Sequence, residues 1–151
     1  MRRLSGLLLA GAMLVLPVFS QAAFGQAAPP PKFTINGEVA ILSVQVTAGK
    51  TADYEMVLAK LKEVLNNSTP EAKQQAAGWK VVKSSTPLAD GNIIYMHIIN
   101  PVPGADYSVL QSIYAVVKDP MEQKALYDLY VGAGAKNQSL GTGSIIVDFS
   151  K

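Results

Sequence analysis

Apolar residues alternate or run together in four short segments, and these patterns predict β-strands. The predicted strands are Glu38–Val46, Trp79–Ser85, Ile93–Ile99 and Ser144–Phe149. The first strand alternates along its whole length, whereas the third holds four Ile, one Tyr and no breaker. Two lysines in the second strand indicate that it lies at an edge of the sheet.

Apolar residues at helical spacing fill the two regions between these strands, and each region is interrupted once. The predicted helices run from Thr51 to about Leu65 with Tyr54 in the buried stripe, from Pro70 to Ala77, from an N-cap at Asp106 to about Lys118, and from Pro120 to the glycines at 132 and 134. Thr69 and Asp119 each precede a proline, which is typical of an N-cap followed by the first helical position. The glycine-rich stretch 139–143 is expected to be a loop.

The predicted elements follow the order β-α-β-β-α-β, with each helical region broken in two. This order is typical of an α+β, ferredoxin-like fold, the split βαβ arrangement. We therefore expect one four-stranded antiparallel sheet that carries its helices on one face and leaves the other face open.

Side chains alternate between the faces of a sheet, so each strand residue can be assigned to one of them. In the third strand Ile94, Met96 and Ile98 are all apolar, and we expect them to lie under the helices. The other parity then faces outward, and the same reasoning applies to the first and last strands. The expected ligand-binding residues on the open face are Ser43, Gln45, Tyr95, His97 and Asp148.

The N-terminus has the pattern of a secretory signal peptide. Arg2 and Arg3 precede an apolar stretch, Leu4–Val18, which is shorter than the roughly 20 residues of a membrane span. Small residues suit cleavage after Ala22, with a second position after Ala27. An uncleaved N-terminal anchor is the alternative.

The predicted organisation is therefore a signal peptide at 1–22, a proline-rich spacer at 23–32 and one domain at 33–151. The mature protein is expected to be periplasmic or secreted, with no stable membrane span after cleavage.

Composition excludes several classes of protein. The 151-residue chain has no Cys, which rules out a lipid-anchored cysteine, disulfides, thiol catalysis and thiolate metal sites. It has 13 Lys and Arg residues, and its two arginines leave with the signal peptide, so 11 lysines balance 11 acidic residues. A neutral surface without arginine cannot make the many phosphate contacts that nucleic-acid binding needs.

Three segments of the chain give it a fold-level resemblance to a known group. The segments AILSVQVTAGKTADYEMVLAKL, GWKVVKS and YMHIINPVPGADY resemble those of the dimeric α+β barrel proteins, which include antibiotic-biosynthesis-monooxygenase-like and stress-responsive barrel domains. The resemblance implies a homodimer whose two sheets pack across a two-fold axis and enclose a cavity. Members include cofactor-free monooxygenases, isomerases and haem-binding or haem-degrading proteins. The haem-degrading members use a set of Asn, Trp and His residues, and Trp79 and His97 of this chain are not matched to members of that set.

His97 is the chain's one histidine and its best catalytic candidate. It could exchange protons, oriented by Asp148, because imidazole titrates near neutral pH. The favoured interpretation is a hydrogen-bonded residue of a dimer interface, because one His without a nucleophile identifies no reaction class.

Two classes of function follow. The favoured one is a non-catalytic exported module that binds a small hydrophobic or amphipathic ligand or assembles as a homodimer. The alternative is a cofactor-independent, monooxygenase-like enzyme with Tyr95 and His97 near its substrate. No cofactor or metal is predicted, and haem is kept as an alternative.

Overall fold

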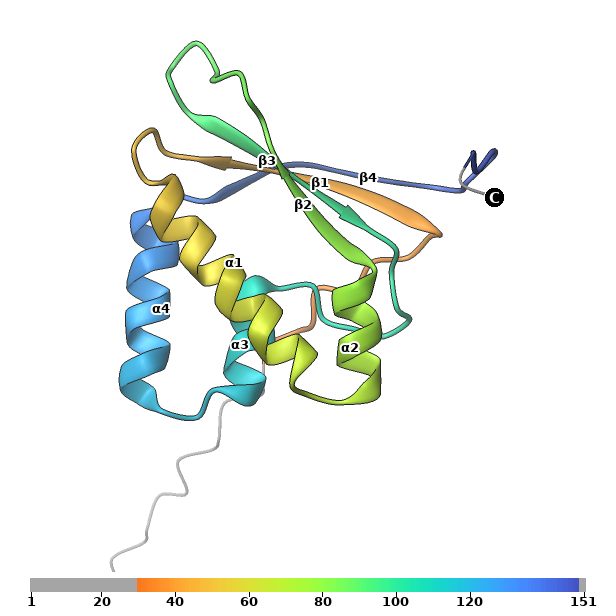
Figure 1. Ribbon diagram of the computed structural model, residues 1–151, viewed down its shortest axis with the longest axis horizontal. Coiled ribbons are helices and arrows are strands. Elements are labelled where there is room, and N and C mark those ends of the chain that lie inside the picture. Colours follow the sequence, from red (N-terminus) through yellow and green to blue (C-terminus); the bar gives the residue numbers. More distant parts are fainter. Residues whose placement is uncertain (1–29, 150–151) are drawn as a thin grey trace, which may run out of the picture. The chain divides into compact units, whose positions relative to one another are not determined.

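A computed structural model describes residues 30–149, and the described residues from Pro31 onward belong to one compact unit (Figure 1). Its elements are β1 (Val39–Val46), α1 (Thr51–Asn66), α2 (Pro70–Ala77), β2 (Trp79–Lys83), β3 (Ile93–Ile99), α3 (Val109–Val116), α4 (Pro120–Gly132) and β4 (Lys136–Gly143). The predicted signal peptide and most of the predicted spacer lie outside the described residues.

The four strands form one antiparallel sheet in the order β2-β3-β1-β4. All four helices lie against the same face of this sheet, and the opposite face carries no helix of the described chain (Figure 1). The predicted α+β, ferredoxin-like split βαβ fold is therefore confirmed, with β2 at an edge as its lysines indicate.

The central strand β1 shows the alternation that its sequence predicts. Ala40, Leu42 and Val44 are buried beneath the helices, and Ile41 is exposed on the other side. Against this row α1 packs its own buried stripe, which includes Tyr54. Burial of a large aliphatic side chain stabilises a fold by about 1.5–3 kcal/mol, so these rows supply much of the force that holds helices to sheet.

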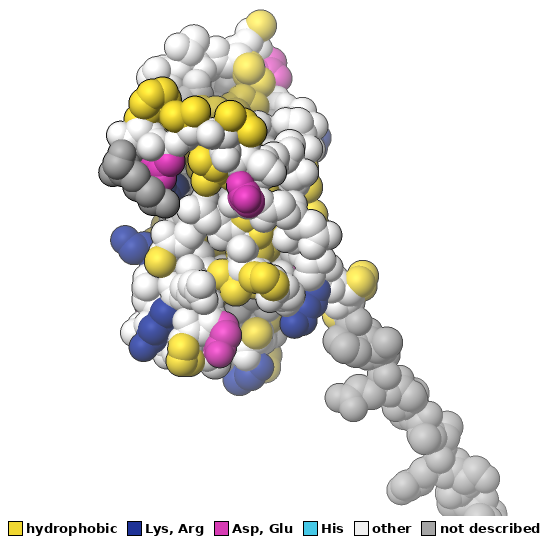
Figure 2. Space-filling model, turned by 90° about the vertical axis from the view of Figure 1, so that its right-hand side faces the viewer, with side chains coloured by type: hydrophobic (Ala, Val, Ile, Leu, Met, Phe, Trp, Pro, Cys, Tyr) yellow, Lys and Arg dark blue, Asp and Glu magenta, His cyan; other side chains and the backbone are white. Residues whose placement is uncertain are grey.

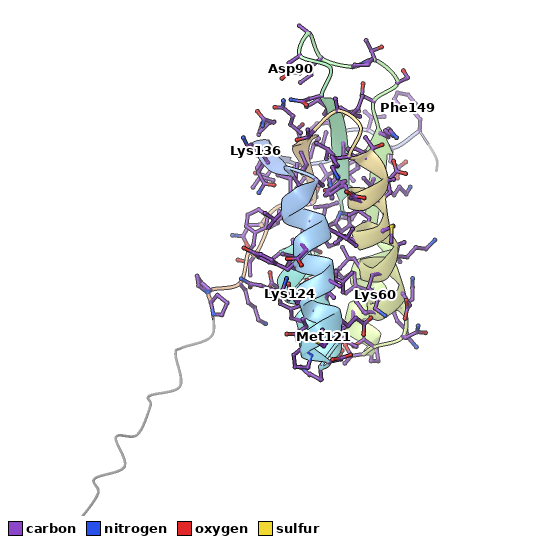
Figure 3. All side chains as sticks on the ribbon, turned by 90° about the vertical axis from the view of Figure 1, so that its left-hand side faces the viewer. Lys60, Asp90, Met121, Lys124, Lys136 and Phe149 are labelled. Atoms are coloured by element: carbon purple, nitrogen blue, oxygen red, sulfur yellow. The ribbon has the colours of Figure 1, made fainter. Side chains whose placement is uncertain are left out.

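Polar groups fix the ends of the helices. The Thr69 hydroxyl accepts a hydrogen bond from the backbone N–H of Ala72 at 3.3 Å, and the Asp119 carboxylate accepts one from Met121 at 3.0 Å. Both predicted N-caps are thus confirmed. The α1 and α4 helices lie side by side (Figure 3), where Lys60 forms an ion pair with Glu122 at 2.9 Å.

The third helix begins two residues later than predicted, because its N-cap is Ser108 and not Asp106. The Asp106 carboxylate accepts hydrogen bonds from the backbone N–H groups of Ser108 and Phe33, at 2.9 and 3.1 Å. Asp106 therefore ties the segment before β1 to the loop before α3, and the helix starts only at Val109.

The prediction of the last strand was wrong. Residues 136–143, expected to include a loop, form β4, and the expected strand Ser144–Phe149 lies beyond it. The physical reason is the connection from α4. Gly134 turns the chain with φ +62°, and the Ala133 carbonyl accepts a hydrogen bond from Thr47 at 3.0 Å. This turn delivers residue 136 beside Gln45, where backbone hydrogen bonds to β1 outweigh a weak strand propensity.

The assignment of the two faces of β3 was also wrong. Tyr95, His97 and Ile99 are buried under the helices, whereas Met96 is exposed on the open face. Both parities of β3 are rich in apolar residues, so alternation alone could not choose between them. The choice depends on hydrogen-bond partners for Tyr95 and His97, which only the helix side provides.

Candidate ligand-binding site

The five residues predicted to bind a ligand do not share one surface. Ser43 and Gln45 lie half-buried on the open face of β1, as predicted. Tyr95 and His97 are buried on the opposite face of the sheet. Asp148 lies in the exposed segment after β4, outside the sheet. The structure therefore brings Tyr95 and His97 together but separates them from the other three.

His97 is fully buried in the middle of β3, and each of its ring nitrogens has a partner. The Tyr54 hydroxyl of α1 lies 2.8 Å from Nε2, and the indole N–H of Trp79 in β2 donates to Nδ1 at 3.0 Å. A helix, an edge strand and a central strand thus each contribute one side chain to this cluster, which we call the Tyr54–His97–Trp79 cluster.

These partners determine which nitrogen of His97 carries the hydrogen. An indole N–H can only donate, so Nδ1 must be an acceptor without a hydrogen. A neutral imidazole then has its hydrogen on Nε2, which donates to the Tyr54 oxygen. The hydroxyl hydrogen of Tyr54 is left for another acceptor, and within the described residues this hydroxyl makes no second hydrogen bond.

Burial keeps the cluster uncharged. Desolvation lowers the pKa of His97 to about 4, because the charged imidazolium is disfavoured away from water. Desolvation also raises the pKa of Tyr54 well above its usual range, with smaller contributions from the nearby Tyr130 and Tyr95. At neutral pH the site therefore presents a neutral imidazole and a neutral phenol.

Tyr54 borders a cavity of about 240 Å³ between the sheet, α3 and α4. Its apolar walls include Phe33, Leu42 and Val109, and its polar residues besides Tyr54 and His97 are Tyr107, Ser108, Gln111, Tyr130 and Asn137. Asn137 is exposed on β4, so the cavity reaches the molecular surface there. The volume equals that of roughly eight water molecules, and it lies just below the range of about 300–1,000 Å³ typical of ligand pockets.

Tyr95 supports this site from the side without lining the cavity. Its ring packs edge-on against Tyr54, with ring centres 5.0 Å apart. Its hydroxyl donates to Glu55 at 2.6 Å, and Lys83 donates to the same carboxylate oxygen at 2.9 Å. These bonds, that of Lys83 first, lower the pKa of Glu55. Tyr95 is therefore a positioning residue for Tyr54.

A second, larger hollow of about 620 Å³ lies between α1, α2 and β2. Its apolar floor includes Leu58, Leu65 and Trp79, and its polar rim is made by exposed side chains such as Glu55 and Lys62. Trp79 borders this hollow while its N–H is bonded to His97. The hollow lacks a buried polar group among its described residues, whereas the 240 Å³ cavity has Tyr54 and His97.

Tyr54 and Trp79 are the site residues that the sequence analysis did not assign. A signal for Tyr54 was present, because a tyrosine in a buried stripe needs a partner for its hydroxyl. The chain has one His, which was the natural candidate for that partner. What the sequence could not supply was the face of β3 on which His97 lies.

The cluster does not fit a metal or haem site. Both nitrogens of His97 are hydrogen-bonded within the protein, so neither is presented to an iron. Across residues 30–149 no three His, Asp or Glu side chains are grouped as metal ligands.

A search of residues 30–149 for a helix with the length and apolar character of a membrane span finds none. Comparison of the chain with protein-family models, with curated proteins and with solved structures gives no match.

Proposed function

We propose that this chain is an exported, homodimeric module that binds a small neutral ligand in the cavity beside Tyr54. The observation that carries the proposal is the hydrogen-bond arrangement of the Tyr54–His97–Trp79 cluster. His97 occupies the Tyr54 oxygen as a donor, so the hydroxyl hydrogen of Tyr54 is left for an acceptor atom on the ligand.

The chemistry of the cavity favours an uncharged ligand. The buried imidazole and phenol stay neutral at physiological pH, so they offer no opposite charge to offset the desolvation of an ionic ligand. Apolar walls such as Leu42 and Val109 favour a hydrocarbon or aromatic body. The expected ligand is therefore amphipathic, with a carbonyl or similar acceptor at one end.

Binding is favoured over catalysis because His97 is poorly suited to proton transfer. A general base works best with a pKa near the operating pH, and burial holds the pKa of His97 at about 4. Its two nitrogens are already used by Tyr54 and Trp79. The cluster is thus built to orient one hydroxyl group.

The test compares two probes of similar shape, acetophenone and isopropylbenzene, of which only the first has an acceptor. Acetophenone should bind the wild-type protein more tightly. In Tyr54→Phe that advantage should disappear, with a loss of about 1 kcal/mol, or roughly fivefold in affinity. Ligand-observed NMR titration measures both affinities.

Tyr127→Phe is the matched control, because Tyr127 is exposed on α4. It should bind both probes as the wild type does. If neither probe binds, or if Tyr54→Phe keeps the preference for acetophenone, the proposed site is wrong.

Export and assembly complete the proposal. The N-terminal pattern supports a cleavable signal peptide, and N-terminal sequencing of the protein recovered outside the cytoplasm should begin at residue 23 or 28.

A dimer is supported by the open sheet face, where Ile41, Val82 and Met96 are exposed on three neighbouring strands. The same arrangement is what the resemblance to dimeric α+β barrel proteins implies.

A further inference from the structure

The segment 144–149, which we call the C-terminal arm, exposes large apolar side chains. Ile146 is 89% exposed and Phe149 is 96% exposed, and Ile145 and Val147 are also exposed. Isolated apolar residues on a surface are ordinary, but four within five positions are not. The arm also has the composition and alternation of a strand, although it pairs with no strand of the described chain.

The start of the arm is held at one end of the sheet. The backbone N–H of Ile145 donates to the Glu38 carboxylate at 2.8 Å, and the N–H of Glu38 donates to the Gly143 carbonyl at 3.1 Å. Beyond this point the arm leaves the end of β4 away from the helices (Figure 1), and Phe149 lies apart from α1 and α4 (Figure 3). Figure 2 looks onto the right-hand side of the view in Figure 1 and shows hydrophobic side chains gathered on the upper part of this side.

The open sheet face is the other unpartnered apolar surface of the described chain. Ile41 and Met96 are exposed at its centre, and Val82 is paired with Met96 on the next strand. Lys80 lies on the same face, opposite Ile98. This surface and the arm therefore both expose apolar side chains that no helix or strand of the described chain covers.

We infer that the C-terminal arm of one copy covers the open sheet face of a second copy, with Phe149 near Met96. The inference rests on the proposed homodimer and names the segment that completes it. In a two-fold dimer each contact is made twice, so the exchange covers both arms and both faces at once. Phe149 alone can bury about 150–250 Å², which is about a fifth to a third of the roughly 800 Å² per partner in a standard interface.

The absence of cysteine makes the contact directly testable. The full exported chain is prepared as two single variants, Met96→Cys and Phe149→Cys, with the second isotopically labelled. After mixing and mild oxidation, mass spectrometry should find a disulfide between residue 96 of one copy and residue 149 of the other. Its yield should exceed by at least tenfold that of a control pair, Met121→Cys with Phe149→Cys, because Met121 is exposed on α4.

Equal yields from both pairs would overturn the inference. So would a Met96→Cys/Phe149→Cys double variant that closes its disulfide within one chain, because the arm would then cover its own sheet.

A second measurement separates the arm from the dimer itself. Ile146→Ser combined with Phe149→Ser should raise the dimer dissociation constant at least tenfold in analytical ultracentrifugation. An unchanged dimer would refute the role of the arm and leave the proposed homodimer intact. A wild-type chain that is monomeric at micromolar concentration would refute both.

Discussion

Both faces of the sheet contain polar residues, but the two faces differ in how far these residues are buried and in which groups they bond. On the helix-covered face, Tyr95 and His97 are buried and their polar atoms are hydrogen-bonded to Glu55, Tyr54 and Trp79. On the open face, Ser43 and Gln45 are half-buried beside exposed apolar neighbours. The comparison teaches that a polar side chain can lie on the inner face wherever the neighbouring elements supply its partners.

The largest expected difference between the faces comes from paired substitutions in β3. His97→Ala removes a buried ring and leaves Trp79 and Tyr54 without their hydrogen-bond partner, so it should lower the free energy of unfolding by about 3–5 kcal/mol. Met96→Ala, one residue away on the open face, should cost less than about 1 kcal/mol. Urea denaturation followed by circular dichroism measures both.

The protein concentration in that experiment must be low enough that assembly does not contribute to stability. Similar losses for the two variants would mean that the cluster adds nothing to ordinary core packing.

The dependence of stability on pH sharpens the comparison further. The unfolded chain takes up a proton on His97 as the pH falls through about 6.5, whereas the folded chain does so only near pH 4. The unfolded state therefore binds more protons between these values, and the free energy of unfolding falls as the pH is lowered across this window. The loss should reach roughly 3 kcal/mol at pH 4.

His97→Gln has no titrating group at this position, so its stability should change much less between pH 6.5 and 4.5. Chemical denaturation at closely spaced pH values tests this. A wild-type protein with constant stability across the window would show that His97 is not buried as a neutral ring.

The smallest effect is expected on the open face. The Gln45 side chain donates to the Asp90 carboxylate at 3.1 Å in an exposed position. Water replaces such a hydrogen bond readily, so Gln45→Ala should change the free energy of unfolding by no more than about 0.5 kcal/mol. A loss above 2 kcal/mol in the same denaturation assay would show that the open face is as tightly organised as the covered one.

Elements whose alternating apolar residues or N-terminal prolines fit one conformation could be predicted from the sequence. The alternation of β1 placed Leu42 and Val44 under the helices, and the proline signals at positions 70 and 120 placed the starts of α2 and α4. In these segments the local pattern and the tertiary structure favour the same conformation, so the pattern alone was enough.

The site could not be predicted because it depends on contacts between distant segments. Tyr54 and His97 are 43 positions apart, and both parities of β3 are apolar enough to be buried. The last strand was wrongly predicted for the same reason, because residues 136–143 form β4 in place of residues 144–149. The turn at Gly134 brings residues 136–143 beside β1, although residues 144–149 have the stronger strand propensity.

The bond between Trp79 and His97 also gives the molecule an intrinsic optical reporter. Trp79 is the chain's one tryptophan, and its indole N–H is bonded to a ring that lines the cavity. Indole emission depends on the polarity and hydrogen bonding around the ring, so a ligand that enters the 240 Å³ cavity should alter the wavelength and intensity of the emission. Candidate compounds can therefore be screened on the unlabelled protein by its intrinsic tryptophan fluorescence.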